Sequence, residues 1–448
     1  MIIPLERGAI PYGELARILQ APFPHALCGT VPTRLVTHAS EVQSGDLFCA
    51  LVGKRDGHDY IHEACEHGAS AVISERKTEA DIPHLIVPSV SEALGVWARA
   101  VTAGASPIRI GVTGSVGKTT VKDALRAALS VRYRVHATHG NQNNELGLPF
   151  TLLSAPRTSE VLVCEVGVSH PDEMEPLSDI LRPHLSVITC IGHAHIGAFG
   201  SRERIAEEKR ALLSHAEGGG GVFVPMGEPL LSFLPPRGIR RTAVLPFSQR
   251  EAERFSLPYV EEDAPRRFAL AYALALSEAL GLTEAECKEG LSRVFSLQTR
   301  RKEEVCKDVT LIDDGYNASP ESVMSALDYL RTKGEGGRIA VLGDMLELGE
   351  ESAAFHRAVG RYAAHSADIL VFFGAYASEY ERGARAAGAK ELTAGEGGHP
   401  RYLHFTGTRK ELAHAIATLL RGKEFVLFKA SRAHAVEKTV ALLKEELK

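Results

Sequence analysis

The chain has 448 residues, of which 44% are hydrophobic and 24% charged, as is typical of soluble globular proteins with sizeable cores. Its formal net charge of −5 provides no basic excess, so the composition favours neither nucleic acid nor an anionic membrane as a partner. No apolar run approaches the ~18 residues of a membrane-spanning helix, and the first residues lack the charged start and apolar core of a signal peptide.

The seven cysteines are odd in number, and no two of them form a C-x-x-C pair. They lie mostly in apolar or helical surroundings, which predicts reduced thiols. Together with the missing signal peptide, this favours a cytoplasmic protein.

The first of three expected domains covers residues 1–103, since ~150 residues per domain suggest about three domains in this length. Short strand-like pieces alternate there with helical stretches. The strands are expected at Arg34–Thr37, Gly45–Leu51 and Ala71–Ser74, and a helix at Tyr60–Gly68. The small, polar segment Thr102–Pro107 is predicted to be the linker to the next domain.

The second and third domains, residues 104–300 and 301–448, both alternate apolar strands with amphipathic helices. This alternation predicts an α/β fold with parallel sheets and crossover helices. In the second domain the strands are Ile108–Thr113, Val161–Val166 and Leu185–Cys190, and the helices Lys118–Ser130 and Glu203–His215. In the third domain the strands are Val309–Asp313, Arg338–Leu342, Ile369–Phe373 and Phe425–Phe428, and Ala394–Arg401 is expected to be a surface loop.

The segment IGVTGSVGKTTVKDAL contains the sharpest local motif, a glycine-rich turn between a buried strand and a helix. Such a turn directs backbone N–H groups and a helix N-terminus at phosphate oxygens. The predicted nucleotide-binding residues are Gly114, Ser115, Val116, Gly117, Lys118, Thr119 and Thr120. Lys118 is placed to reach the β- and γ-phosphates, and the Thr119 hydroxyl to bind Mg²⁺.

The strict phosphate-loop pattern fails at one position, because Val112 stands where its first glycine belongs. The alternative is therefore an ordinary glycine-rich turn, although the strand before it and the helix after it favour nucleotide binding. The motif predicts that a nucleotide binds and leaves the reaction open.

Four further side chains, at predicted strand ends or within a predicted helix, allow both a functional and a plain interpretation. Glu165 ends an apolar strand, where a carboxylate can hold Mg²⁺ or simply face solvent. His193 and His195 follow another strand, two residues apart, and are either metal or phosphate ligands or ordinary loop histidines. Lys209 lies within a helix, where a lone lysine usually belongs to a solvated face.

Several longer segments resemble the Mur ligase family of ATP-dependent ligases. They are GSVGKTT, Thr138–Leu153, Cys164–Pro183 and the HAH loop, followed by Ile312–Val323 and Val341–Ser352. The last two resemble the branch of the family that adds D-alanyl-D-alanine, and the DNPR sequence of the diaminopimelate-adding branch is absent. The resemblance covers about residues 34–440 and implies an N-terminal substrate domain, a central ATPase domain and a C-terminal Rossmann-like domain.

The resemblance also implies roles for individual residues. Lys118 and Thr119 would hold ATP phosphates and one Mg²⁺ ion, with Glu165 completing that metal site. His195 would hold a second Mg²⁺ ion together with Lys209, which reacts with CO₂ to form a carbamate, and this reverses the plain interpretation of Lys209. A carbamate is anionic and rich in oxygen, as Mg²⁺ prefers, and the lysine must first lose its proton, which a desolvated site encourages.

Five more positions match residues that lie near the nucleotide in the family: Asn143, Asn144, Arg301, Asn317 and Asp344. Asn143 and Asn144 belong to a segment near nucleotide and substrate, Asn317 matches an adenine-side asparagine, and Arg301 matches an arginine near the phosphates. Since Arg301, Asn317 and Asp344 come from the third domain, closure of the domains is expected to complete the site.

The sequence departs from the family at two places. The Asp-Ser-Arg tripeptide near the UDP group is replaced by His38-Ala39-Ser40, although GDLFCAL and DGHDYI follow it as expected. The C-terminal Lys-Gly-Ser-Arg is replaced by Lys429-Ala430-Ser431-Arg432, which matters only if the backbone there requires a positive φ.

The implied activity is the ATP-dependent ligation of D-alanyl-D-alanine to UDP-N-acetylmuramoyl-tripeptide through an acyl phosphate, a step of peptidoglycan synthesis. The cofactors would be ATP and two Mg²⁺ ions, and the protein would be a monomer that neither binds nucleic acid nor enters a membrane. One alternative is a related ligase with another amino-acid substrate. The other is a non-catalytic nucleotide-binding protein, which decay at His38-Ala39-Ser40 would favour.

Overall fold

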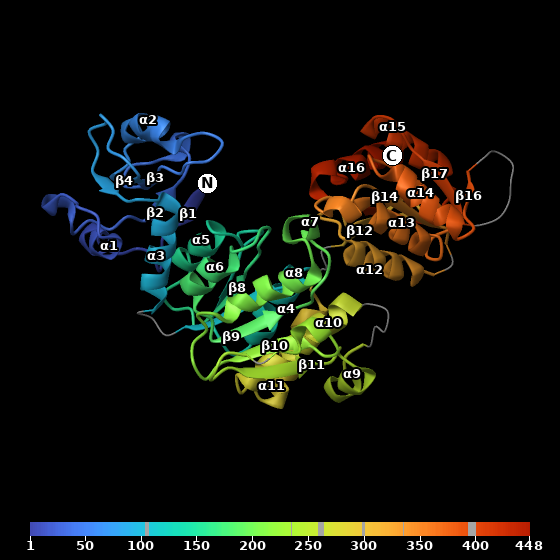
Figure 1. Cartoon of the computed structure of the whole chain (residues 1–448), viewed down its shortest axis with the longest axis horizontal. Helices are drawn as coiled ribbons and strands as arrows, with labels where there is room; N and C mark the ends of the chain where they lie inside the picture. Colours follow the sequence, from blue (N-terminus) through green and yellow to red (C-terminus); the bar gives the residue numbers. More distant parts are fainter. Residues whose placement is uncertain (104–106, 234, 259–263, 298–300, 335, 393–399) are drawn as a thin grey trace.

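The computed structural model describes residues 1–103, 107–233, 235–258, 264–297, 301–334, 336–392 and 400–448. Three sheets follow one another along the chain, each surrounded by helices (Figure 1). The α/β architecture expected from the alternating pattern is therefore confirmed. The expected domain boundaries at 103/104 and 300/301 lie beside stretches outside the described residues. Within the described ranges, no helix combines the length and apolar character needed to cross a bilayer.

The first sheet has the order β1-β2-β3-β4-β5, and only the β1–β2 pair is antiparallel. Its strands are β1 Ile2–Pro4, β2 Arg34–Val36, β3 Leu47–Cys49, β4 Ala71–Ser74 and β5 His84–Ile86, and its helices α1 Tyr12–Leu19, α2 Ile61–Glu66 and α3 Val90–Ala103. Each strand contributes three or four residues, so the sheet is small.

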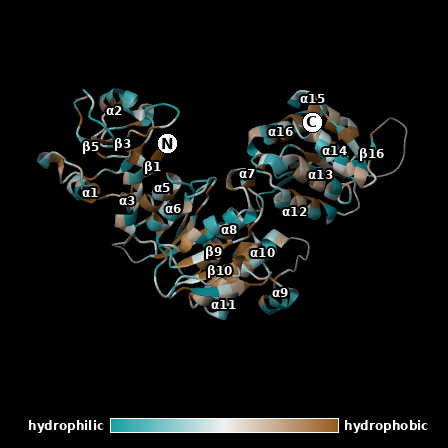
Figure 2. Ribbon diagram, viewed as in Figure 1, coloured by the Kyte–Doolittle hydropathy of each residue, from teal (hydrophilic) through white to brown (hydrophobic). Residues whose placement is uncertain are grey.

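The second sheet is parallel throughout, in the order β11-β10-β9-β6-β8-β7. Its strands are β6 Ile108–Thr113, β7 Val135–Ala137, β8 Val161–Glu165, β9 Leu185–Ile188, β10 Gly221–Pro225 and β11 Arg240–Val244. Its helices are α4 Lys118–Leu129, α5 Gly147–Leu153, α6 Met174–Leu181, α7 Ile196–Phe199, α8 Arg202–Arg210, α9 Gln249–Phe255, α10 Ala264–Ala279 and α11 Glu284–Phe295. The central strands are hydrophobic and lie between helices of mixed character (Figure 2), as strands buried on both faces must be.

The third sheet has the order β12-β13-β18-β14-β15-β17-β16, with β12 antiparallel at one edge. Its strands are β12 Lys302–Cys306, β13 Val309–Asp313, β14 Arg338–Leu342, β15 Ile369–Phe372, β16 Lys390–Glu391, β17 Arg401–His404 and β18 Phe425–Lys429. Its helices are α12 Pro320–Arg331, α13 Ser352–Ala363, α14 Ala377–Ala386, α15 Arg409–Leu419 and α16 Glu437–Glu446.

Helix α3 connects the first sheet to the second unit. Gly95 in this helix lies so close to Ile180 of α6 that an added Cβ would come within 2.7 Å of the isoleucine Cδ1. Arg99 forms an ion pair with Asp179 at the same junction. One continuous apolar cluster includes Trp97 and Leu162, so the first and second units share a hydrophobic core.

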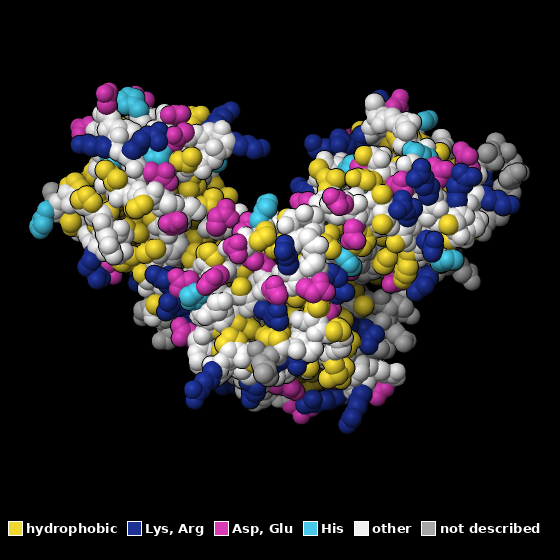
Figure 3. Space-filling model, viewed as in Figure 1, with side chains coloured by type: hydrophobic (Ala, Val, Ile, Leu, Met, Phe, Trp, Pro, Cys, Tyr) yellow, Lys and Arg dark blue, Asp and Glu magenta, His cyan; other side chains and the backbone are white. Residues whose placement is uncertain are grey.

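The first and third units rise as two arms from the central unit, with a deep notch between them (Figure 3). In the central unit β6 pairs in parallel with both β8 and β9, so the carboxyl ends of the three strands lie at one edge of the sheet. In open parallel sheets, ligands bind at this edge.

The predicted strands at Ala71–Ser74, Ile108–Thr113, Val309–Asp313 and Arg338–Leu342 have the observed bounds. The helix expected over Glu203–His215 ends earlier, because α8 stops at Arg210 and a 3₁₀ turn follows over Ala211–Leu213. The loop expected at Ala394–Arg401 lies largely outside the described residues, but its last residue, Arg401, begins β17.

Candidate active site

A cleft of about 630 Å³ lies where the carboxyl edge of the second sheet faces the third unit, a volume suited to a nucleotide-sized ligand. Twelve of the predicted nucleotide and metal residues line it: Ser115, Val116, Gly117, Lys118, Thr119, Thr120, Asn143, Asn144, Glu165, His195, Arg301 and Asn317. The predicted residues that lie outside its lining are Gly114, Lys209 and Asp344.

The phosphate-binding loop connects β6 to α4, and the segment that follows β9 fixes its shape. The Ser115 N–H donates to the Cys190 carbonyl at 3.0 Å, and Ser115 Oγ accepts from the Gly192 N–H at 2.9 Å. Lys118 begins α4, and its Nζ donates to the Gly114 carbonyl at 2.8 Å. The loop is therefore held in place by the segment after β9 and by its own lysine.

Gly114 belongs to the phosphate-binding loop although it does not line the cleft. Its φ is +144°, and a Cβ added there would lie 1.9 Å from Thr189 Oγ1. We expect Gly114→Ala to weaken ATP binding about 5- to 100-fold, because backbone strain of this kind costs ~1–3 kcal/mol. Titration with a fluorescent ATP analogue measures the effect.

Gly218→Ala is the matched control, since a Cβ there meets nothing within 4 Å. Unchanged ATP affinity in Gly114→Ala would show that the loop tolerates the added carbon.

Glu165 stands at the end of β8 and is 3% exposed. Its two carboxylate oxygens are held from both sides: Thr119 Oγ1 donates to Oε2 at 2.5 Å, and Asn143 Nδ2 donates to Oε1 at 2.8 Å. The solvent-facing interpretation of Glu165 is therefore wrong.

The donors around Glu165 fit Mg²⁺, because this ion prefers carboxylate and hydroxyl oxygens. Among the described residues there is no group of three or more His, Cys, Asp or Glu side chains that forms a complete metal cage. A bound Mg²⁺ ion would thus take further ligands from water and from the phosphates, as is usual for this ion.

His193 and His195 meet different carboxylates of the third unit. The His193 N–H donates to Glu321 Oε1 at 2.9 Å, the His193 ring forms an ion pair with the same carboxylate, and it packs on Phe355 at 4.6 Å between centroids. His195 lines the cleft, and its Nδ1 lies 2.6 Å from Glu347 Oε2. Of the two histidines, only His195 faces the place where phosphates and metal would bind.

Lys209 is 4% exposed, so the prediction of a solvated helical lysine from the residues alone is wrong. Burial, together with the nearby charge of Lys118, lowers the pKa of Lys209 from 10.5 to about 7. A lysine in this state is a neutral amine for a substantial part of the time at neutral pH, and the neutral amine is the nucleophilic form.

This lowered pKa makes the stability of the fold depend on pH. Between pH 7 and 10.5 the unfolded chain binds more protons at Lys209 than the folded one, so the free energy of unfolding rises with pH. The cost of the buried charge is fully present below about pH 7. Below about pH 7 we expect Lys209→Met to have a larger free energy of unfolding than the parent protein, and this difference should shrink as the pH rises towards 10.5. Urea unfolding in CO₂-free buffer measures the free energy of unfolding of both proteins.

The control is Arg204→Met, an exposed position in the same helix, which should show no such pH-dependent difference. An equal difference at every pH would exclude the titration of Lys209 as its cause.

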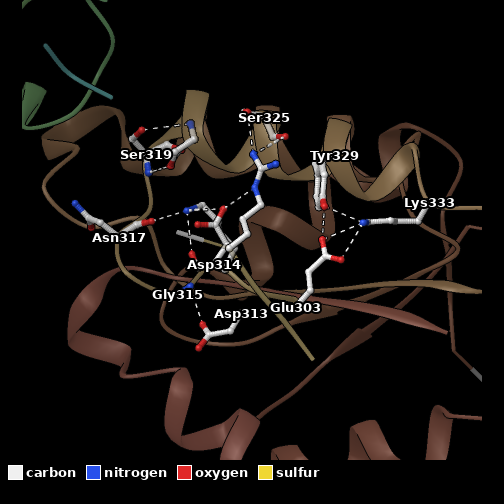
Figure 4. Close-up of polar contacts among 12 residues, drawn as sticks. Glu303, Asp313, Asp314, Gly315, Asn317, Ser319, Ser325, Tyr329 and Lys333 are labelled. Atoms are coloured by element: carbon white, nitrogen blue, oxygen red, sulfur yellow. Dashed lines mark hydrogen bonds and ion pairs between the residues drawn. The ribbon is translucent and has the colours of Figure 1, made fainter. Parts of the chain in front are cut away.

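The third unit faces the cleft with a small network around Asp314 (Figure 4). Asp314 Oδ2 lies 3.5 Å from Arg301 Nε and 3.3 Å from Lys429 Nζ. Arg301 also stacks on the Tyr329 ring at 4.4 Å, and Lys429 Nζ donates to the Asn317 carbonyl at 2.7 Å. Two cations thus share one carboxylate beside the predicted phosphate site.

The local sequence explains why Asn317 stands at the end of this network. Ser319 caps α12 by accepting from the Ser322 N–H, and Pro320 occupies the first helical position, where its fixed φ favours helix initiation. The turn before the helix is therefore rigid, and the Asn317 side chain points away from Asp314 (Figure 4).

Asp344 is buried, and its carboxylate contacts other residues of the third unit. Its carboxylate accepts from the N–H groups of Ala375 and Tyr376, both at 2.9 Å, and lies 3.1 Å from His434 Nε2. It therefore holds the turn before α14, and its role near the nucleotide stays a prediction.

Other lining residues were assigned no role from the sequence. They include Ser169, His170, Arg266, Asp314, Tyr316 and Lys429. All of these except Arg266 fall inside quoted motifs, so closer attention to those motifs identifies them. Arg266 follows a stretch without a motif and carries no comparable signal.

The two departures from the family pattern have different structural settings. Ala430 is buried and is not among the residues with positive φ, so alanine fits where the family pattern has glycine. His38, Ala39 and Ser40 lie in the first unit, in or beside a short 3₁₀ turn, and do not line the cleft.

The comparisons with known proteins cover the whole length of the chain. Residues 112–254 match the Mur ligase middle domain, and residues 299–432 match the Mur ligase glutamate ligase domain. UDP-N-acetylmuramoyl-tripeptide–D-alanyl-D-alanine ligase of Bacillus subtilis is 31% identical over 435 residues, which are 92% of this chain and 93% of that protein.

Two solved structures have the same fold. MurF from Acinetobacter baumannii matches with a TM-score of 0.84 and 27% identity, covering 99% of this chain and 100% of that one. MurF from Thermotoga maritima in complex with ADP matches with a TM-score of 0.77 and 30% identity, covering 92% and 97%. The similarity therefore includes all three units.

Proposed function

This chain belongs to the Mur ligase family, and on that premise we propose how its own residues carry out the ligation. It is an ATP-dependent, ADP-forming ligase that joins D-alanyl-D-alanine to UDP-N-acetylmuramoyl-tripeptide, giving the pentapeptide precursor of peptidoglycan. The observation that carries the proposal is the cleft in which the phosphate-binding loop, Glu165 and His195 face Arg301 and Asn317 of the third unit.

A carboxylate is a poor electrophile, so it must be activated before an amine can attack it. The γ-phosphoryl group of ATP passes to the terminal carboxylate of the tripeptide, giving an acyl phosphate and ADP. The amine of D-alanyl-D-alanine then attacks the acyl carbon, and phosphate leaves from the tetrahedral intermediate. Lys118 and the loop N–H groups hold the phosphates from one side, and Arg301 holds them from the other.

We propose two metal-binding positions. Thr119 and Glu165 would hold the first Mg²⁺ ion, and His195 and carbamylated Lys209 would hold the second. When bound, Mg²⁺ offsets the repulsion between phosphate and carboxylate and orients their oxygens. Asn143 supports this arrangement by its hydrogen bond to Glu165, Asn144 lies beside it in the lining, and Asn317 faces the adenine.

The carbamate of Lys209 is supported by the burial and lowered pKa of this amine. The neutral nitrogen adds to the carbon of CO₂ and releases a proton to water, leaving an N-carboxylate. This change replaces a buried positive charge beside Lys118 with a negative one, so the two side chains attract instead of repelling each other.

The substrate is placed by all three units in this proposal. The first unit binds the UDP end across the notch, and the third unit brings the amine substrate to the acyl phosphate. The reaction takes place in the cytoplasm, and the enzyme acts as a monomer. The free state of all seven thiols is in keeping with a reducing compartment.

The test is a substrate panel with purified protein, ATP and Mg²⁺. With UDP-N-acetylmuramoyl-tripeptide and D-alanyl-D-alanine as substrates, we expect ADP, phosphate and the pentapeptide product to form. Mass spectrometry identifies the pentapeptide product. Single amino acids in place of the dipeptide serve as the comparison. Turnover with a single amino acid but not with the dipeptide would reassign the amine substrate, and ATP binding without any amine-dependent turnover would favour a non-catalytic protein.

A further inference from the structure

The contact between α7 and the loop after β14 brings together two residues in an unusual backbone conformation. His195 has φ +62° and Glu347 has φ +66°, a region that side-chain-bearing residues seldom occupy and that costs of order 1 kcal/mol or more each. The two residues come from the second and third units, and Figure 1 shows α7 at their junction. Strain of this kind persists only where the surrounding structure enforces it.

The backbones on either side of the pair enforce this conformation. The Gly197 N–H donates to the Glu347 carbonyl at 3.0 Å. A Cβ added to Gly349 would lie 2.7 Å from Gly197 Cα, so these two backbones meet at a distance that only glycine permits. Ile196, Phe199 and Leu348 belong to one apolar cluster at the same place.

The loop that carries Glu347 is held by hydrogen bonds within the third unit. The buried His356 accepts from the Met345 N–H at 2.9 Å through Nε2, and its Nδ1 lies 2.6 Å from the Ser352 carbonyl. Ser431 Oγ accepts from the Leu346 N–H at 2.8 Å. The backbone that carries Glu347 is thus held by the core of the third unit.

The contact with Glu347 occupies one of the two ring nitrogens of His195. Glu347 Oε2 lies 2.6 Å from Nδ1, so Nδ1 faces the carboxylate and Nε2 is the ring nitrogen left to bind a metal ion. Within the described part of the chain, Nε2 has no hydrogen-bonding partner, and His195 lines the cleft whereas Glu347 does not. Metal-binding histidines usually donate their second ring N–H to a carboxylate, which fixes the ring and raises its basicity, and Glu347 supplies a carboxylate beside the second ring nitrogen of His195.

We propose that Glu347 is a positioning residue for the metal: from the third unit, it orients His195 so that Nε2 binds the ion held in the second unit. This inference rests on the proposed function, in which His195 is a metal ligand. It makes metal affinity depend on the docking of the third unit, because the carboxylate moves with that unit. By linkage, a bound ion strengthens the docking in return.

The test measures Mn²⁺ binding to the full chain with a non-hydrolysable ATP analogue, using the EPR signal of free Mn²⁺. We expect Glu347→Ala to weaken Mn²⁺ binding about tenfold, as removal of such a partner typically does. Glu347→Gln, which keeps an acceptor oxygen, should recover part of that loss. Glu350→Ala removes an exposed charge from the same loop and should leave the affinity unchanged.

A double-mutant cycle separates this role from a general effect on folding. In a His195→Ala background, Glu347→Ala should have no further effect on Mn²⁺ affinity, since Glu347 acts through His195. Unchanged or tighter Mn²⁺ binding in Glu347→Ala would overturn the inference while leaving His195 a ligand. If His195→Ala itself leaves Mn²⁺ affinity unchanged, then the proposed metal site is wrong and the inference fails with it.

Discussion

Replacing Lys209 with alanine is expected to lower kcat about a thousandfold, the effect of losing a group that stabilises charge in a water-excluded site. The side chain is buried beside Lys118, so no other residue or water replaces its carbamate easily. The KM for ATP should change much less, because the phosphate-binding loop and Lys118 are untouched. Initial rates of ADP release at saturating substrates measure both values.

A chemical rescue distinguishes loss of the carbamate from loss of the fold. Short carboxylates such as formate or acetate should restore part of the activity of Lys209→Ala, because they return two anionic oxygens to the cavity left by the side chain. Arg204→Ala, at an exposed position of α8, is the control and should keep full activity. Full activity of Lys209→Ala without added carboxylate would remove the carbamate from the mechanism.

Replacing Lys118 with alanine should be equally severe and should not be rescued by carboxylates. We expect kcat/KM for ATP to fall by about two to three orders of magnitude, because a preorganised cation beside the transferred phosphoryl group is lost. An added anion increases the negative charge at this position, so formate should leave the activity unchanged or lower it. The opposite response of the two lysine variants to formate separates their roles.

The measurement combines nucleotide titration with the rate of ADP release. Lys288→Ala is a suitable control, since this lysine is exposed on α11 and contacts Ser256. A Lys118→Ala variant with normal kcat/KM would show that the loop binds phosphate through its N–H groups alone.

Much of the central unit could be predicted because its signals are local. Ile108–Thr113 is mostly apolar and is followed at once by the glycine-rich loop and by α4. One continuous segment of the sequence therefore predicts the strand, the turn and the helix. Glu165 was placed correctly at a strand end, since β8 is an apolar run that stops there. Such features need no knowledge of distant contacts.

The features that were missed depend on tertiary contacts. Lys209 has the pattern of an exposed helical lysine, and only tertiary packing buries its side chain. Asp344 lies in a matched motif, yet its carboxylate accepts hydrogen bonds from the N–H groups of Ala375 and Tyr376. The pairing of His195 with Glu347 joins residues 152 positions apart, and no local pattern predicts it.

The core shared by the first and second units has a consequence for how the enzyme melts. Because α3 buries apolar side chains against α6, separating these two units exposes hydrophobic surface on both. The two therefore denature together, in one calorimetric transition whose enthalpy corresponds to their combined size. An isolated N-terminal fragment would expose this surface to solvent and aggregate.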